Sequence, residues 1–178
     1  MLIRRAGNIY NIIDMGGESM ILYNLKDFPQ YIEEFVLICH EEWGSPWADC
    51  EIEKKLSEGI SKALKRLENY PTLILLDNDI LVGFVSLFEK DCEERENLSP
   101  WYATLYVKEQ YRGNNITKKL SEAIIEKAKK MGFEKIYLKT ELENFYDKYG
   151  FKYLENISKD EKIYYMDLKW GKKWLLKN

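Results

Sequence analysis

One stretch, Gln110 to Lys118 (Q-Y-R-G-N-N-I-T-K), constrains the fold most, because the hydrophobic pattern changes on either side of it. Before it, residues 101–107 alternate with a period of two, which is typical of a strand. After it, apolar residues recur at helical spacing up to Gly132. A strand that opens through a polar turn into a helix leaves unpaired N–H groups at the helix start, which favour an anion. With the guanidinium of Arg112, the stretch predicts a cradle for a phosphate or pyrophosphate.

A plainer interpretation stays open at this point. Strand-to-helix turns are common, and Gly113 in such a turn can serve only to relieve backbone strain. The two common nucleotide-binding patterns, G-x-x-x-x-G-K-[ST] and G-x-G-x-x-G, are both absent from the sequence. The predicted cradle therefore belongs to neither of these two classes.

Composition and charge exclude several classes of protein. With 178 residues, 46% of them hydrophobic and 32% charged, we expect one soluble globular domain. The net charge of −3 gives no support for binding to nucleic acid. No apolar run is long enough to span a membrane and the start of the chain lacks the apolar core of a signal peptide, so we expect a cytoplasmic protein. Three cysteines and a single histidine, His40, predict no metal site.

The hydrophobic pattern predicts an α/β protein with a mixed sheet. Asp27 is expected to cap the first helix, and residues 77–79 are expected to turn a β-hairpin. The strands are expected at residues 20–25, 72–76, 80–88, 101–107, 135–140, 151–155 and 162–168. The helices are expected at about residues 29–43, 51–70, 116–131 and 142–149.

The chain is expected to contain one domain with a short segment at each end. Residues 1–19 show no clear periodicity and are predicted to be an N-terminal extension that the fold does not need. Residues 20–170 form the predicted domain, and residues 171–178 are a basic tail. Whether the aromatic and basic end from Trp170 onward packs on the domain, pairs with a second subunit in a homodimer, or frays is left open.

Two motifs give the chain a resemblance to a known family. The run V-K-E-Q-Y-R-G-N-N-I-T-K-K-L resembles the acetyl-CoA signature of the GNAT superfamily of N-acetyltransferases, and N-F-Y-D-K-Y-G-F, at residues 144–151, resembles its second motif. The resemblance covers residues 20–168 and implies a single domain with a mixed, mostly antiparallel central sheet flanked by helices. The segments E-E-W-G, S-P-W and L-K-T are similar to a bacterial subgroup of unassigned substrate and, more remotely, to enzymes that acetylate the N-terminus of actin.

The resemblance implies acetyl-CoA as co-substrate and a role for each matching residue. Tyr146 matches the tyrosine near the CoA sulfur, which would protonate the leaving thiolate. The backbone at Leu105, Tyr106 and Val107 would bind the pantetheine arm as an added strand. The pyrophosphate would be bound by the residues of the turn and the helix start: Gln110, Arg112, Gly113, Asn114, Asn115, Ile116, Thr117 and Lys118.

The sequence departs from the family pattern at Asn115 and Thr117, where the signature usually has small residues or glycine. Asparagine tolerates a left-handed backbone better than other residues with a side chain, so we expect Asn115 to adopt the same turn. Its side chain also takes up room beside the phosphates, and the departure therefore bears on CoA affinity.

The general base and the substrate contacts are less well defined by the sequence. His40 titrates in the useful range and is a candidate base, although a lone histidine at a helix end is more often a surface group. Glu42 and Asp91 are candidate substrate contacts. Trp43 and Trp101 are either wall residues of a substrate cleft or core residues, and both interpretations stay open.

The resemblance implies an N-acetyltransferase that moves the acetyl group to a primary amine by direct attack in a ternary complex. The alternative is a weak or inactive CoA-binding regulatory module with the same fold. A toxin that acetylates aminoacyl-tRNA is a third interpretation, which the net charge disfavours. The acceptors that remain open are a polyamine, an aminoglycoside-like antibiotic, a free amino acid, and a protein N-terminus or lysine.

Overall fold

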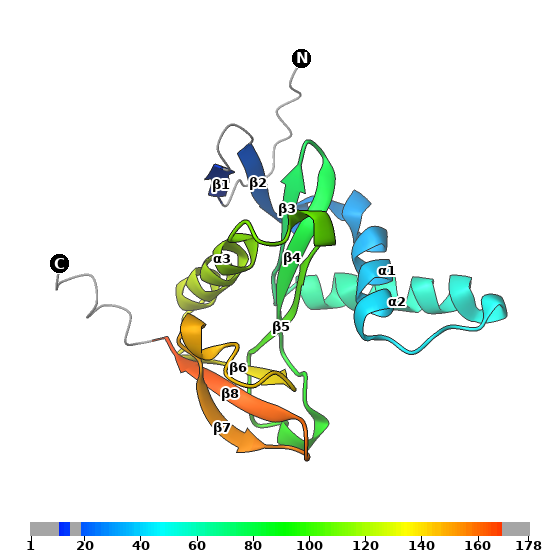
Figure 1. Cartoon of the computed structure of the whole chain (residues 1–178). Coiled ribbons are helices and arrows are strands. Elements are labelled where there is room, and N and C mark those ends of the chain that lie inside the picture. Colours follow the sequence, from blue (N-terminus) through cyan, green and yellow to red (C-terminus); the bar gives the residue numbers. More distant parts are fainter. Residues whose placement is uncertain (1–10, 15–18, 169–178) are drawn as a thin grey trace. The chain divides into compact units, whose positions relative to one another are not determined.

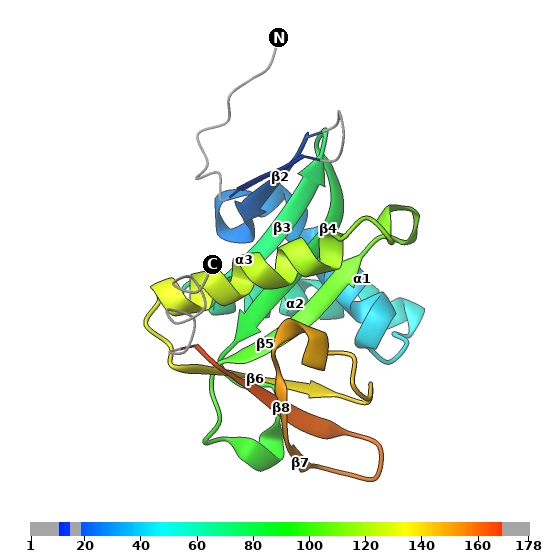
Figure 2. The same cartoon turned by 60° about the vertical axis from the view of Figure 1, so that its left-hand side comes forward.

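The computed structural model describes residues 11–14 and 19–168 (Figures 1 and 2). These residues form two compact parts, and the division between Phe84 and Val85 falls inside one strand. The first part ends at Phe84 and the second begins at Val85.

The strands of the first part follow one another in an antiparallel order. They are β1 (Asn11–Asp14), β2 (Ser19–Asn24), β3 (Thr72–Asp77) and the beginning of β4 (Ile80–Phe88). In the register, Asn11 lies opposite Leu22, and Ile21 lies opposite Leu76. The predicted β-hairpin between β3 and β4 is confirmed.

The turn of this hairpin uses two residues with positive φ. Asn78 has φ 45° and Asp79 has φ 68°. Two-residue hairpin turns of this kind match the right-handed twist of the flanking strands, and asparagine and aspartate accept the left-handed conformation more readily than most residues. The short polar sequence therefore explains why the chain reverses here.

Two α-helices complete the first part, α1 (Ile32–Trp43) and α2 (Ile52–Leu67). Short 3-10 helices precede them: η1 (Leu25–Asp27), η2 (Pro29–Tyr31) and η3 (Asp49–Glu51). The prediction that Asp27 caps the first helix is wrong. The side chain of Asn24 accepts a hydrogen bond from the N–H of Lys26 at 3.1 Å, and the chain then passes through η2 before α1 begins. Gly44 ends α1 as expected, donating its N–H to the carbonyl of His40.

The second part contains the rest of β4, four further strands and one α-helix. The sheet order is β4-β5-β6-β8-β7, with β5 parallel to β6 and the last two pairs antiparallel. The elements are β5 (Trp101–Val107), α3 (Ile116–Lys130), β6 (Lys135–Thr140), β7 (Lys152–Asn156) and β8 (Lys162–Asp167). Three short 3-10 helices lie between them: η4 (Glu93–Arg95), η5 (Glu109–Tyr111) and η6 (Asp147–Tyr149).

Helix α3 forms where the helical periodicity predicts it. Its buried residues Ile116, Leu120, Ile124 and Ala128 recur every four positions, which places them on one face. This face packs against β5. The helix ends with Lys129 and Lys130 in its last turn, where cations favour the negative end of the helix dipole.

The structure differs from the predicted elements in two places. The helix expected at residues 142–149 is wrong, since only the 3-10 turn η6 forms there. Asn144 has φ 57°, and a left-handed residue cannot lie inside a right-handed helix. The second difference is β1, a strand at residues 11–14 where no element was expected.

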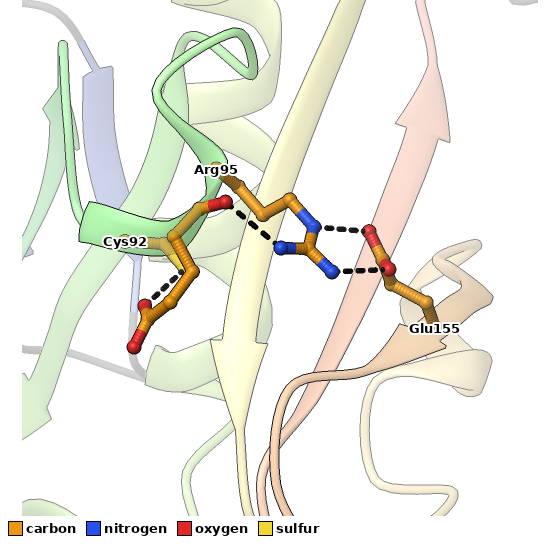
Figure 3. A network of polar contacts seen from close by, with 4 residues as sticks. Cys92, Arg95 and Glu155 are labelled. Carbon is orange, nitrogen blue, oxygen red and sulfur yellow. Dashed lines mark hydrogen bonds and ion pairs between the residues drawn. The ribbon is translucent and has the colours of Figure 1, made fainter.

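The segment between β4 and β5 is fixed by a bidentate ion pair (Figure 3). The guanidinium of Arg95 donates from Nε and Nη2 to the carboxylate of Glu155 on β7, at 2.8 and 2.7 Å. The Nη1 atom of the same side chain donates to the carbonyl of Glu94 at 2.8 Å. Arg95 therefore joins this segment to a strand 60 residues further along the chain.

Two properties of residues 11–14 and 19–168 bear on the kind of protein. No helix among them has the length and the apolar composition needed to cross a bilayer. Within the same ranges, no three histidine, cysteine, aspartate or glutamate side chains gather where they could bind a metal ion.

The domain boundary after residue 19 remains a prediction. A variant that begins at Met20 is expected to unfold at the same temperature as the full chain, because β2 keeps its pairing with β3 and the burial of Met20 and Leu22. Thermal unfolding of both proteins measures this. A loss of several degrees would show that the pairing of β1 with β2 contributes to stability and that the boundary is misplaced.

Candidate functional site

The site begins at an irregular strand. Thr104 in the middle of β5 has φ 48°, and positive φ in a β-branched residue is a true outlier that costs on the order of 1–3 kcal/mol. The register between β5 and β6 contains a single pair, Trp101 opposite Tyr137. Beyond that pair the two parallel strands run apart, as Figure 2 shows. Leu105 and Tyr106, which follow Thr104, are half-buried, and Val107 is buried.

The turn after β5 contains two left-handed residues. Gly113 has φ 85° and Asn115 has φ 59° and ψ 11°. A side chain at position 113 would meet no atom within 4 Å, so the glycine is required for its backbone angle and not for space. The expectation that Asn115 adopts the left-handed turn is confirmed.

Arg112 links the turn to the strand. Its Nε donates to the carbonyl of Val107 at 3.1 Å, and its backbone N–H donates to the carbonyl of Glu109. The side chains from Arg112 to Asn115 are exposed, as is Gln110, whereas Ile116 is buried and anchors the helix. No described side chain caps the N-terminus of α3. The first N–H groups of α3 therefore lie between two exposed cationic residues in the chain, Arg112 before the helix and Lys118 in its first turn, where Lys118 pairs with Glu122 at 3.9 Å. Such a helix start suits an anion.

Tyr146 lies in a cluster of aromatic rings in the same part of the chain. Its ring packs edge-on against Tyr102 of β5, with ring centroids 6.0 Å apart, and against Phe151 at 5.9 Å. Phe145 and Tyr149 flank it at 4.9 and 6.2 Å. The structure thus brings Tyr146 together with β5, although residues 142–146 are not helical.

The hydroxyl of Tyr102 connects this cluster to the first turn of α3. It lies 2.7 Å from Ser121 Oγ, and both side chains are buried. Ser121 donates its only hydroxyl proton to the carbonyl of Thr117 at 2.7 Å, so Tyr102 must be the donor of the other bond. The sequence analysis missed Tyr102, because alternation in a strand gives no information on which hydroxyl groups meet.

Burial changes the acidity of both tyrosines. It raises the pKa of Tyr146 to about 12, and the nearby Tyr149 adds to the effect. Burial also raises the pKa of Tyr102 well above its ordinary value, against the opposing effect of the hydrogen bond to Ser121. Tyr146 is therefore fully protonated at neutral pH and able to donate its proton.

Two other candidate residues lie at the opposite end of β5. Trp101 is completely buried, packs with Cys92 and Ile163, and donates its indole N–H to the carbonyl of Leu98 at 2.8 Å. This supports the core interpretation of Trp101. Asp91 lines a pocket of about 560 Å³ with Lys139 and several glutamates. Cys92, which also lines this pocket, packs with Trp101 at the start of β5, whereas the turn follows the end of that strand.

The remaining candidates lie on α1, in the first part of the chain. The imidazole of His40 stacks on the indole of Trp47, with centroids 3.7 Å apart and planes at 14°. Trp43 is 53% exposed and Glu42 is exposed. Their roles as base and as substrate contacts remain predictions.

Asn115 offers a test of the turn. Replacing Asn115 with alanine is expected to lower the free energy of unfolding by about 1 kcal/mol, because a backbone at φ 59° costs alanine more free energy than it costs asparagine. Glycine at the same position should change the free energy of unfolding by less than about half of the effect of alanine, because glycine adopts positive φ without this cost. Chemical denaturation of the two variants measures the difference. Equal effects of alanine and glycine would mean that the left-handed angle does not matter.

The comparisons with known proteins agree with this geometry. The profile of the Acetyltransferase (GNAT) family matches residues 30–151, which cross from the first part into the second. The N-alpha-acetyltransferase 30 of Schizosaccharomyces pombe (strain 972 / ATCC 24843) is 34% identical over 109 residues, which cover 56% of this chain and 72% of the relative.

Solved structures share the fold at lower identity. The PaiA N-acetyltransferase from Thermoplasma acidophilum, in complex with coenzyme A, has a TM-score of 0.61 and 22% identity over 84% of this chain and 99% of that one. The aminoglycoside 6'-acetyltransferase type Ii has a TM-score of 0.60 and 18% identity, covering 83% and 97%. YncA, a putative acetyltransferase from Salmonella typhimurium with acetyl-CoA, has a TM-score of 0.56 and 16% identity, covering 84% and 94%.

The α/β fold with a mixed, mostly antiparallel sheet is thus confirmed. The chain belongs to the Acetyltransferase (GNAT) family and is an N-acetyltransferase that uses acetyl-CoA.

Proposed function

We propose that the protein transfers the acetyl group of acetyl-CoA by direct attack of a primary amine in a ternary complex, and that its acceptor is the α-amine of a polypeptide N-terminus. The relative that is 34% identical is named for action at an alpha nitrogen, which supports this acceptor class. The observation that carries the reaction is the divergence of β5 from β6, next to the turn that opens α3, together with the ring of Tyr146, which packs on Tyr102 of β5.

The acidity of the acceptor fits the groups available. An N-terminal α-amine has a pKa of about 8 and a lysine side chain about 10.4, so roughly a tenth of the former is neutral at pH 7 and far less of the latter. An α-amine therefore loses its proton to water or to a weak base. A lysine side chain would need a stronger base, and the base remains unassigned.

The co-substrate would be bound by the turn and by the strand. Arg112 and the first N–H groups of α3 suit the pyrophosphate, and the backbone at Leu105 to Val107 suits the amide groups of the pantetheine arm. An N–H group of this backbone would donate to the thioester oxygen as charge develops on it. As the amine nitrogen bonds to the carbonyl carbon and the C–S bond breaks, Tyr146 would donate its proton toward the thiolate sulfur.

Burial makes Tyr146 a weaker acid than the sequence alone suggests. A phenol with a pKa of about 12 transfers its proton to a thiolate with a pKa of about 8.5 at a cost of roughly 5 kcal/mol. The hydroxyl therefore acts first as a hydrogen-bond donor to the developing negative charge, and full transfer follows as the thiol leaves.

The acceptor class is tested by measuring thiol release from acetyl-CoA with matched amines. We expect turnover with a peptide that has a free N-terminus and little with the same peptide blocked at its N-terminus but containing lysine, or with a polyamine. Arg112→Ala should lower kcat/KM for acetyl-CoA roughly tenfold, as expected when a charged hydrogen bond is lost. Lys130→Ala, which removes the same charge at the other end of α3, is the control.

Three results would contradict the proposal. Preference for the blocked peptide or the polyamine would change the acceptor class. Equal effects of Arg112→Ala and Lys130→Ala would remove Arg112 from the binding site. If the protein binds acetyl-CoA but no amine causes release of the CoA thiol, the regulatory module would be favoured.

Tyr146→Phe tests the proton donor, because it keeps the ring that packs on Tyr102 and removes the hydroxyl. The rate is expected to fall by roughly 100-fold or more, with acetyl-CoA affinity and stability little changed. Because the pKa of Tyr146 is raised to about 12, its hydroxyl stays protonated up to pH 10. The ratio of wild-type to variant kcat should therefore be the same at pH 7 and pH 10.

An ordinary phenol, with a pKa of about 10, would be half ionised at pH 10, and the ratio would fall to about half. Such a fall would mean that the hydroxyl of Tyr146 is not in the buried state described above. Full activity of Tyr146→Phe on an identified amine would remove the residue from the catalytic machinery.

A further inference from the structure

Thr104 has a strained backbone inside a strand, and a partly buried hydrogen bond accompanies it. Its Oγ1 donates to Ser86 Oγ of β4 at 2.6 Å. Ser86 has no exposed surface and stands in an otherwise apolar strand, I-L-V-G-F-V-S-L-F. The bond therefore joins the hydroxyl of Thr104 to a side chain that is held inside β4.

The position of Thr104 relates this bond to the site. The single β5–β6 pair, Trp101 with Tyr137, precedes Thr104, and the backbone that suits the acyl-pantetheine arm, residues 105–107, follows it. A left-handed residue between these two segments redirects the chain, as an irregularity in a strand does. The orientation of the N–H groups at residues 105–107 therefore depends on φ at Thr104.

We propose that the hydroxyl pair of Ser86 and Thr104 acts as a lock that keeps β5 in the conformation able to bind acetyl-CoA. Both are positioning residues, since they act through the backbone of residues 105–107. The inference rests on the proposed function in one respect, the binding of the pantetheine arm along β5. According to this inference, the side chains of Ser86 and Thr104 increase the affinity of the protein for acetyl-CoA.

Substitutions at Thr104 separate a lock from ordinary strand packing. Valine has the shape of threonine without the hydroxyl, and it disfavours positive φ as strongly. Glycine also lacks the hydroxyl but adopts positive φ without cost. If Thr104 only packs in the strand, the valine variant should bind acetyl-CoA more tightly than the glycine variant, because strands favour β-branched residues and are weakened by glycine. If the pair is a lock, the glycine variant should bind acetyl-CoA more tightly than the valine variant.

The experiment measures the Kd of acetyl-CoA by calorimetry, with each variant kept below its unfolding temperature. Thr104→Val and Ser86→Ala are each expected to raise Kd roughly tenfold, the size of one buried hydrogen bond. Thr104→Gly should stay within roughly threefold of the wild type. In the Thr104→Gly background, Ser86→Ala should have no further effect, since glycine needs no lock.

Several results would overturn the inference. They are a Thr104→Val protein that binds acetyl-CoA like the wild type, a Thr104→Gly protein that binds as weakly as Thr104→Val, or an unchanged effect of Ser86→Ala in the glycine background. A wild-type protein that binds acetyl-CoA but acetylates no N-terminal amine would contradict the proposed function alone. The binding series would then still decide on the lock.

Discussion

Parallel strands must keep an even set of slanted hydrogen bonds if they are to stay together, and β5 and β6 do so at only one position. Trp101 lies opposite Tyr137, and the N–H of Tyr137 donates to the carbonyl of Pro100. This pair joins the strands near their beginnings, and their other ends separate. The crossover through α3 leads from the free end of β5 back to the start of β6. The turn and the start of α3 follow the end of β5, and the aromatic cluster joins Tyr102 of β5 to Tyr146 and Phe151, which follow β6.

Local signals in the sequence were strong where the chemistry of one residue fixes the backbone. The periodicity of α3, the polar turn at Asn78 and Asp79, and the left-handed angle of Asn115 could all be predicted, because each follows from a property of the residues themselves. The same reasoning was wrong for Asp27. Asn24 caps the short helix η1, which contains Asp27, and neither η2 nor α1 has a side-chain cap. The preference of such side chains for caps does not say at which residue a helix begins.

Other features depend on residues far apart in the chain, and local patterns could not reveal them. Threonine favours strands, so nothing at Thr104 suggests φ 48° or a hydrogen bond to Ser86, 18 residues away. Likewise, the hydroxyl of Tyr102 forms a hydrogen bond with that of Ser121, which lies 19 residues further along the chain. A helix was expected at residues 142–149, whereas the ring of Tyr146 packs on Tyr102 and Phe151 from a chain that forms only a short 3-10 turn.

The ion pair between Arg95 and Glu155 closes a loop that contains β5, α3 and β6. Closing a loop of 60 residues costs more entropy than forming a helix, whose contacts are local. We therefore expect α3 to form early during folding and the edge strand β7 to dock late. The turn and α3, for which we propose a role in binding the co-substrate, would form before the ion pair between Arg95 and Glu155. A protein synthesised from its N-terminus could then form α3 and the turn before β7 has left the ribosome.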